Sequence, residues 1–116
     1  MARIIVLDDE VVILNMVQEC LSMDGHKVTV FSDAEPTLTE FDFDLVDLVI
    51  TDLKMPTSGE VFIKELRDRN IQIPIIVMSG RISQETSEIL GKLNVGAVLT
   101  KPFTLIELRR AMNICL

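Results

Sequence analysis

Residues 4–9 read IIVLDD, a short aliphatic run that ends in two carboxylates. A run so short and so rich in β-branched residues is typical of a buried strand in a parallel sheet. Three later runs end in polar residues in the same way: residues 48–51 precede Asp52, residues 75–78 precede Ser79, and residues 97–100 precede Lys101-Pro102. In an open α/β sheet the carboxyl ends of the strands share one edge, so these polar groups are expected to meet there.

Strand and helix patterns alternate along the chain, which predicts right-handed crossovers and a doubly wound parallel α/β sheet. Helices are expected at residues 12–24, 33–40, 58–70 and 83–93, and from Leu105 onward. The other strands are expected at residues 27–31, 47–51, 73–78 and 97–100. We expect a single domain over residues 1–116 without an attached effector domain; a fragment of a longer protein is the alternative.

Local signals predict several helix ends and buried faces. Gly25 and Asn94 suit the left-handed conformation that closes a helix, and Asp33 is a candidate N-cap. Thr104 and Glu107 match a capping box that opens the last helix. Helical spacing predicts inward-facing apolar residues, namely Val61, Phe62 and Leu66 in the third helix and Leu105, Leu108 and Met112 in the last.

The composition argues against several classes of protein. A net charge of −7 does not favour nucleic acid as a partner. No apolar stretch approaches the ~18 residues that span a membrane, and no signal peptide is visible. Cys20 and Cys115 are expected as buried thiols in a reducing cytoplasm. Zinc-site spacing is missing, and His26 is expected at the surface.

The carboxylates of Asp8, Asp9 and Asp52 would lie together at the expected edge. Two unit charges about 4 Å apart repel by about 4 kcal/mol at an effective dielectric of 20, so such a cluster needs a cation. Mg²⁺ fits because it takes one or two carboxylates, waters and phosphate oxygens. Calcium would need a fuller cage of ligands, and zinc or copper would need His or Cys.

A carboxylate can also attack a phosphoryl donor to form an acyl phosphate, and Asp52 is the candidate nucleophile. Lys101 would supply a positive charge for the phosphoryl group. The hydroxyl of Ser79 would donate a hydrogen bond to a phosphoryl oxygen. Ser79 alone would be interpreted as a turn residue, but the combination favours phosphoryl chemistry.

The set Asp8-Asp9, Asp52-Leu53-Lys54-Met55-Pro56, Ser79-Gly80 and Lys101-Pro102-Phe103 resembles the receiver domain of two-component response regulators. The resemblance covers the whole chain and is specific because all the motifs occur in order. It implies a flavodoxin-like fold with five helices and a five-stranded parallel sheet of order 2-1-3-4-5, which members of this family exemplify. It further implies a cytoplasmic, Mg²⁺-dependent signalling switch that is phosphorylated by a sensor histidine kinase or a histidine phosphotransfer protein. By the same resemblance, the chain is not expected to be an enzyme with a separate substrate.

The resemblance also implies roles for individual acidic residues. Asp52 is the phosphoacceptor and a Mg²⁺ ligand. Asp9 binds the ion directly, and Asp8 acts through a water molecule. The backbone carbonyl of Lys54 is the remaining protein ligand.

By the same resemblance, Ser79 reports phosphorylation and Lys101 binds the phosphoryl group, with a bond to Pro102 that is often cis in the family. Three features depart from the family pattern. Lys54 and Arg81 lie two places after Asp52 and Ser79, at positions that in the family influence how fast the phosphoryl group is lost. The loop at residues 56–59 is shorter than usual, which predicts altered geometry beside the site. Val98 stands where the family usually has Tyr or Phe, which predicts a weaker allosteric response because valine is small and stiff.

Two other functions are alternatives to a phosphorylated receiver. A degenerate receiver would act as an unphosphorylated protein-interaction module, but the complete acidic set with Ser79 and Lys101 argues against it. A phosphohydrolase with an aspartyl nucleophile usually has a second Asp two residues after the first, and here that position is Lys54.

Overall fold

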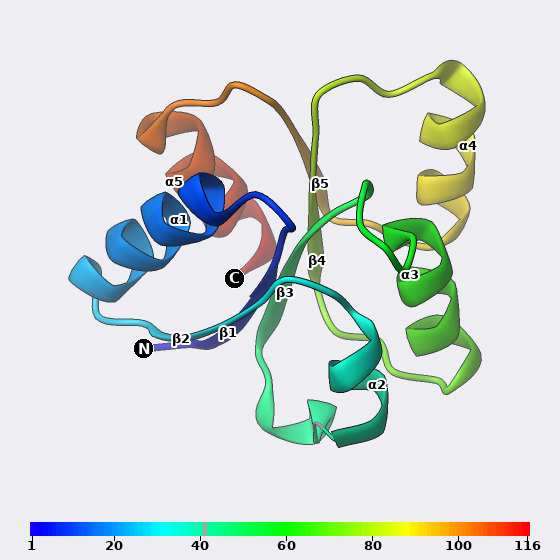
Figure 1. The fold of residues 1–116 in the computed structure, drawn as a ribbon, viewed down its shortest axis with the longest axis horizontal. Helices are drawn as coiled ribbons and strands as arrows, with labels where there is room; N and C mark the ends of the chain where they lie inside the picture. Colours follow the sequence, from blue (N-terminus) through cyan, green and yellow to red (C-terminus); the bar gives the residue numbers. More distant parts are fainter. Residues whose placement is uncertain (41) are drawn as a thin grey trace.

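Figure 1 shows the computed structural model of the chain, a five-stranded parallel sheet with helices on both faces. The structure describes residues 1–40 and 42–116. The strand order is β2-β1-β3-β4-β5, so the predicted flavodoxin-like topology is confirmed. No helix within the described residues is long and apolar enough to cross a membrane.

Strands and helices alternate along the chain as predicted. The strands are β1 Arg3–Leu7, β2 Lys27–Phe31, β3 Leu48–Asp52, β4 Ile75–Ser79 and β5 Ala97–Thr100. The helices are α1 Val11–Met23, α2 Glu35–Glu40, α3 Gly59–Asp68, α4 Gln84–Lys92 and α5 Leu105–Cys115, and a short 3₁₀ helix, η1 Phe43–Leu45, precedes β3.

Several elements begin later than expected. Pro74 lacks an N–H to give to the sheet, so β4 starts after it, while the carbonyl of Pro74 accepts a hydrogen bond from Val49 N at 3.0 Å. Ser58 and Ser83 are the N-caps of α3 and α4 and lie outside these helices. Helix α2 begins at Glu35 and not at Asp33, whose carboxylate accepts hydrogen bonds from Thr57.

The predicted closing signals are confirmed. Gly25 follows α1 with φ 89° and Asn94 follows α4 with φ 58°, both in the left-handed region. Asn70, which was expected inside the third helix, closes it instead with φ 61°. The capping box at the start of α5 is present, with Thr104 and Glu107 each bonding the other's backbone amide.

The sheet separates two apolar cores. Helices α1 and α5 cover one face, and α2, α3 and α4 cover the other (Figure 1). All residues of β3 and β4 are buried, as expected for central parallel strands. Two predicted core residues are wrong: Val61 is 59% exposed because it lies beside the buried face of α3, and Leu105 is 41% exposed in the first turn of α5.

The cysteines and the histidine differ in part from expectation. Cys20 is buried, as predicted, whereas Cys115 is only half-buried at the end of α5. His26 is half-buried and not fully at the surface, and its Nδ1 accepts a hydrogen bond from Ala2 N at 3.1 Å.

Candidate functional site

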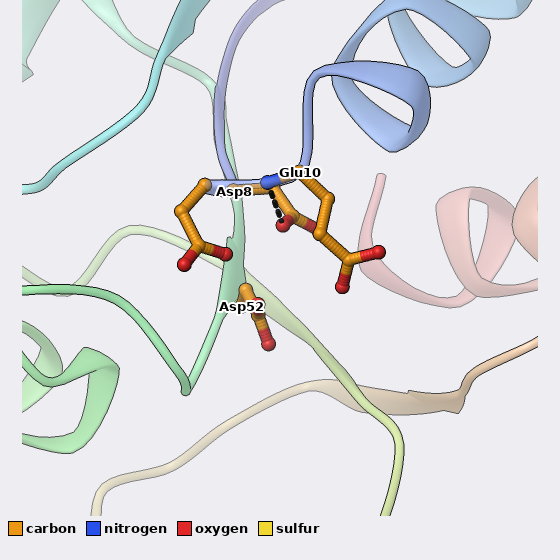
Figure 2. Close-up of side chains that lie close together, drawn as sticks. Asp8, Glu10 and Asp52 are labelled. Atoms are coloured by element: carbon orange, nitrogen blue, oxygen red, sulfur yellow. Dashed lines mark hydrogen bonds between the residues drawn. The ribbon is translucent and has the colours of Figure 1, made fainter.

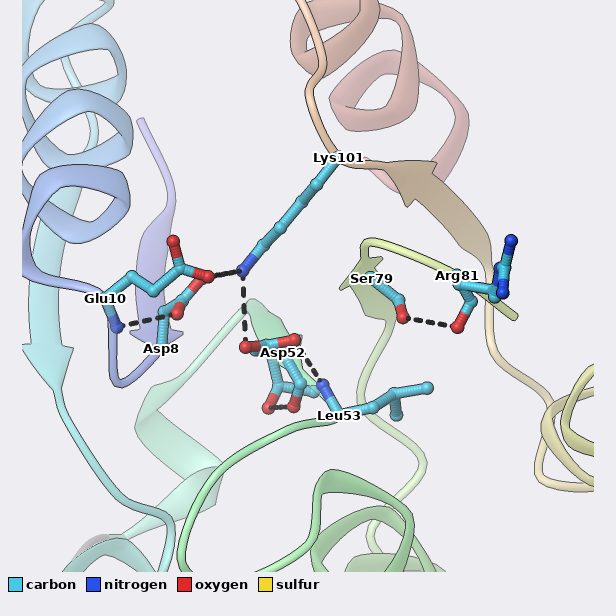
Figure 3. Close-up of polar contacts among 8 residues, drawn as sticks. Asp8, Glu10, Asp52, Leu53, Ser79, Arg81 and Lys101 are labelled. Atoms are coloured by element: carbon cyan, nitrogen blue, oxygen red, sulfur yellow. Dashed lines mark hydrogen bonds and ion pairs between the residues drawn. The ribbon is translucent and has the colours of Figure 1, made fainter. Parts of the chain in front are cut away.

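The carboxyl ends of the strands bring the predicted residues to one edge of the sheet. Asp8 follows β1, Asp52 ends β3, Ser79 ends β4 and Lys101 follows β5 (Figure 3). Backbone bonds align these ends, since Asp8 N donates to Phe31 O at 3.1 Å and Lys101 N donates to Ser79 O at 2.8 Å. The parallel register therefore converts four distant sequence motifs into one site.

Lys101 lies at the centre of this site. Its Nζ donates to Asp8 Oδ2 at 2.7 Å, to Glu10 Oε1 at 3.1 Å and to Asp52 Oδ2 at 3.2 Å (Figure 3). The Asp8 side chain is fully buried, and those of Asp52 and Lys101 are nearly so, whereas the Glu10 side chain is 60% exposed. One ammonium is thus shared by two buried carboxylates and one exposed carboxylate.

Four carboxylates converge beside this lysine. Asp8, Asp9, Glu10 and Asp52 each offer an oxygen atom, and these atoms all lie within 4.8 Å of one another. Figure 2 shows Asp8, Glu10 and Asp52 together, with Glu10 N donating to Asp8 Oδ1 at 2.9 Å. Because every donor is a hard oxygen and the cluster carries more negative charge than Lys101 neutralises, the set fits Mg²⁺.

Burial and pairing shift the pKa of both partners in the closest ion pair. Burial raises the pKa of Asp8, and the hydrogen bond from Lys101 opposes that rise. Burial alone would lower the pKa of Lys101, but its hydrogen bonds to Asp8 and Glu10 and the nearby charges raise it overall. Lys101 therefore stays a cation across the physiological range, whereas the pKa of Asp8 remains above its ordinary value despite the contact with that cation.

The orientation of Asp52 is fixed by its neighbours. Asp52 Oδ1 accepts a hydrogen bond from Leu53 N at 2.8 Å, and Oδ2 faces Lys101. Helix α3 starts against the backbone of Asp52: a Cβ on Gly59 would clash with Asp52 O and would lie 2.8 Å from Leu53 Cα. Glycine is therefore required here because any side chain would clash with backbone atoms.

Ser79 lies in the same hollow as Asp52 but does not face it. Its hydroxyl donates to Arg81 O at 3.1 Å, in the loop that follows β4 (Figure 3). The open hollow has a volume of about 720 Å³, and its lining includes Asp52, Lys54, Ser79, Arg81 and Lys101. The hollow leaves room for a small anionic group between these residues.

Two further predictions concern β5 and the residues directly after it. The peptide bond between Lys101 and Pro102 is cis, as the family resemblance implied. Val98 is 45% exposed and lines a second open hollow of about 680 Å³ between α4 and β5, together with Ile82, Ser87 and Thr100. No bulky side chain of β5 fills this hollow.

Sequence reasoning missed Glu10 as a member of the site. Its carboxylate bonds Lys101 and lies among the other acidic oxygens. A signal was available, because Glu10 directly follows Asp8 and Asp9 and is the third consecutive acid after a buried strand.

Comparisons with known proteins agree with this geometry. Residues 4–113 match the response regulator receiver domain family. The alkaline phosphatase synthesis transcriptional regulatory protein SphR of Synechococcus elongatus is 36% identical over 92% of this chain and 46% of its own length. The transcriptional regulatory protein CpxR of Klebsiella pneumoniae is 38% identical over 93% of this chain and 46% of its own length. This chain thus spans about half the length of these relatives.

Solved structures are similar over nearly the full chain. The chemotaxis protein CheY4 of Vibrio cholerae has a TM-score of 0.91 and 26% identity, covering 100% of this chain and 99% of that one. A response regulator receiver domain protein from Clostridium thermocellum has a TM-score of 0.87 and 31% identity, covering 97% of this chain and 92% of that one. The chain therefore belongs to the response regulator receiver family and is a receiver domain of two-component response regulators.

Proposed function

We propose that this chain accepts a phosphoryl group on Asp52 from a histidine kinase or histidine phosphotransfer protein and acts as a Mg²⁺-dependent signalling switch. The observation that carries the proposal is the shared ammonium of Lys101, which contacts both Asp8 and Asp52 at one edge of the sheet. The same cation that now balances the carboxylates is placed to bind the phosphoryl oxygens that would arrive there.

The transfer itself needs positioning and charge balance more than covalent assistance. An Asp52 oxygen forms the bond to phosphorus while the bond from phosphorus to the donor imidazole nitrogen breaks. That nitrogen keeps the bonding electrons and takes up a proton from solvent. Lys101, already 3.2 Å from Asp52 Oδ2, moves its hydrogen bond to a phosphoryl oxygen.

The acidic residues would hold the ion in the manner the family resemblance implies. Asp9 and Asp52 would bind Mg²⁺ directly, Asp8 through water, and Lys54 through its backbone carbonyl. When bound, Mg²⁺ would neutralise negative charge on the phosphoryl oxygens, as Lys101 would. The oxygen-only donor set within 4.8 Å supports this assignment.

Ser79 would couple phosphorylation to the rest of the domain. Its hydroxyl would leave Arg81 O and donate to a phosphoryl oxygen, which would shift the loop before α4. Val98 is too small to fill the hollow between α4 and β5 as an aromatic residue would, so we expect a small shift or one carried by α4 itself. Backbone NMR with and without beryllofluoride measures this shift; changes confined to residues that contact the ligand would mean that no signal is relayed.

Two alternatives are less well supported. A degenerate receiver would have no use for the complete set of Asp8, Asp9, Asp52 and Lys101, which the structure brings together. For a phosphohydrolase, Lys54 stands where a second Asp would be needed. We therefore also propose that the chain is not an enzyme with a separate substrate, but a phosphoacceptor that assists its own phosphorylation and dephosphorylation.

The experiment is intact mass measurement after incubation with acetyl phosphate, with Mg²⁺ or with excess chelator. We expect a gain of a single phosphoryl group in Mg²⁺ and none in chelator. An equal gain in chelator would contradict the metal requirement, and no gain in either condition would favour the degenerate receiver.

A further inference from the structure

The loop between β3 and α3, residues 53–58, is held at two points. At α3, Gly59 N donates to Leu53 O at 3.0 Å. Across the site, Thr57 donates twice to the carboxylate of Asp33: its backbone N–H bonds Oδ1 at 2.8 Å, and its hydroxyl bonds Oδ2 at 3.1 Å. This loop also carries Lys54, which lies between the two held residues, Leu53 and Thr57.

Asp33 is a firm anchor for this loop. Ala34, the next residue, is fully buried, and its carbonyl accepts a hydrogen bond from the buried hydroxyl of Thr37 at 2.6 Å. On the other side, β2 is joined to the acidic end of β1 by the bond from Asp8 N to Phe31 O at 3.1 Å. The turn that carries Asp33 is therefore tied to the strand end that bears the acidic cluster.

We propose that Asp33 is a positioning residue for Mg²⁺ binding, because through Thr57 it holds the loop at residues 53–58 and thereby the Lys54 carbonyl. This inference rests on the proposed function, in which that carbonyl is a ligand. Mg²⁺ demands near-ideal octahedral geometry at about 2.0–2.1 Å, so a backbone ligand on a loose loop binds it poorly. Groups that orient metal ligands typically change metal affinity about 10–100-fold when removed.

Charge offers a competing explanation, since a carboxylate near the site also attracts a cation. Two substitutions of Asp33 separate the two effects. Both D33A and D33N remove the same negative charge. Only D33A removes the hydrogen bonds, because in D33N the side-chain amide can still accept from the Thr57 N–H and can donate to the Thr57 hydroxyl.

The test is the dissociation constant for Mg²⁺, measured by titration calorimetry on the metal-free protein. We expect D33A to bind about tenfold more weakly than wild type and D33N to bind nearly as well as wild type. T57V, which keeps only the backbone bond, should fall between them, and T57S should match wild type. Amide exchange of Lys54, Met55 and Thr57 in the metal-free protein should be faster in D33A and T57V and unchanged in D33N and T57S.

Each outcome decides between the explanations. Equal weakening in D33A and D33N would show a charge effect alone and would overturn the positioning role, as would unchanged binding in all the variants. If D33A does not fold, the comparison of T57V with T57S decides on its own, and equal binding in these two overturns the proposal. If wild type binds no Mg²⁺, the proposed function fails, and this inference fails with it.

Discussion

Lys101 and Arg67 are cations that lie at opposite ends of the parallel strands, and their hydrogen-bond partners are of different kinds. Lys101, at the carboxyl edge, bonds three carboxylates. Arg67, at the amino edge, bonds the backbone carbonyls of Ile71, Ile73, Leu93 and Asn94 at 2.7 to 3.3 Å. Backbone carbonyls are fixed and neutral, whereas carboxylates can change partners.

The pKa values of Arg67 and Lys101 shift in opposite directions, as their neutral and charged partners lead us to expect. Burial lowers the pKa of Arg67, since its carbonyl partners bring no opposite charge. Hydrogen bonds to Asp8 and Glu10 raise the pKa of Lys101 despite its burial. We infer that Arg67 joins the ends of α3 and α4 permanently, while Lys101 belongs to an exchangeable charge cluster. If so, removing Arg67 should cause the same loss of stability with or without Mg²⁺, and removing Lys101 should not.

The largest effect on stability is expected for Arg67→Met. It removes four hydrogen bonds from a charged donor and leaves their carbonyls without that donor, which we expect to lower the free energy of unfolding by about 3 kcal/mol. Urea denaturation with and without Mg²⁺ measures this loss. Arg67→Lys, which keeps the charge but not the fork of donors, should recover only part of it. A loss of stability that depends on Mg²⁺ would show that the amino edge is energetically linked to the acidic cluster, and would contradict the inferred difference between Arg67 and Lys101.

A smaller and metal-dependent effect is expected for Lys101→Met. Removing the ammonium leaves the carboxylates of Asp8 and Asp52 buried without a cationic partner. We therefore expect the free energy of unfolding of the metal-free protein to fall by about 2 kcal/mol. The loss is smaller than for a buried ion pair whose remaining charge cannot be neutralised, because Asp8 can take up a proton. Mg²⁺ should restore most of this loss and should bind more tightly than to wild type, since Lys101 no longer competes for the same oxygens. Equal destabilisation in chelator and in Mg²⁺ would contradict the exchangeable cluster.

Glu10→Gln tests the exposed member of the cluster. Its side chain is 60% exposed, so the free energy of unfolding should change by less than about 0.5 kcal/mol. Removing its charge from beside the other acidic oxygens should weaken Mg²⁺ binding about threefold at low salt, and added salt should reduce that difference. Glu65→Gln, on the exposed surface of α3, is the matched control and should leave Mg²⁺ binding unchanged.

The smallest effect is expected at the surface ion pair of Asp24 and Arg109, with contacts of 3.0 and 3.2 Å. The hydrogen bond from Arg109 lowers the pKa of Asp24. At pH values above the ordinary carboxyl pKa of 3.8 this pair therefore stabilises the fold, and the stabilisation is lost as the pH falls through the lowered pKa. The stability difference between wild type and Asp24→Asn, followed by urea denaturation from pH 7 to pH 2, should therefore vanish in acid. A difference that persists at pH 2 would show that packing, and not charge, is responsible.

The sequence predicts which residues form the site better than it predicts the hydrogen bonds that orient their side chains. Asp8, Asp52, Ser79 and Lys101 could be placed together because strand ends converge in a parallel sheet, whatever the side-chain conformations are. The hydrogen bond from Lys101 to Glu10 depends on the direction in which the exposed Glu10 side chain points. The spacing of residues in the sequence does not predict that direction.

Other misses have equally local causes. The carbonyl partners of Arg67 belong to loops, and a backbone carbonyl has no signature in the sequence. Asp33 has the residue type of a helix cap, and its carboxylate also accepts hydrogen bonds from Thr57, a contact between two loops that only the folded chain defines. Val61 and Leu105 were assigned to buried faces by spacing, which does not specify where a face ends.

The most direct test of the central claim is the mass of Asp52→Asn beside wild type after incubation with acetyl phosphate and Mg²⁺. The matched control is Asp68→Asn, since Asp68 is an exposed aspartate at the far end of α3. We predict one added phosphoryl group on wild type and on Asp68→Asn, and none on Asp52→Asn. A phosphoryl group on Asp52→Asn at the wild-type level would contradict Asp52 as the phosphoacceptor.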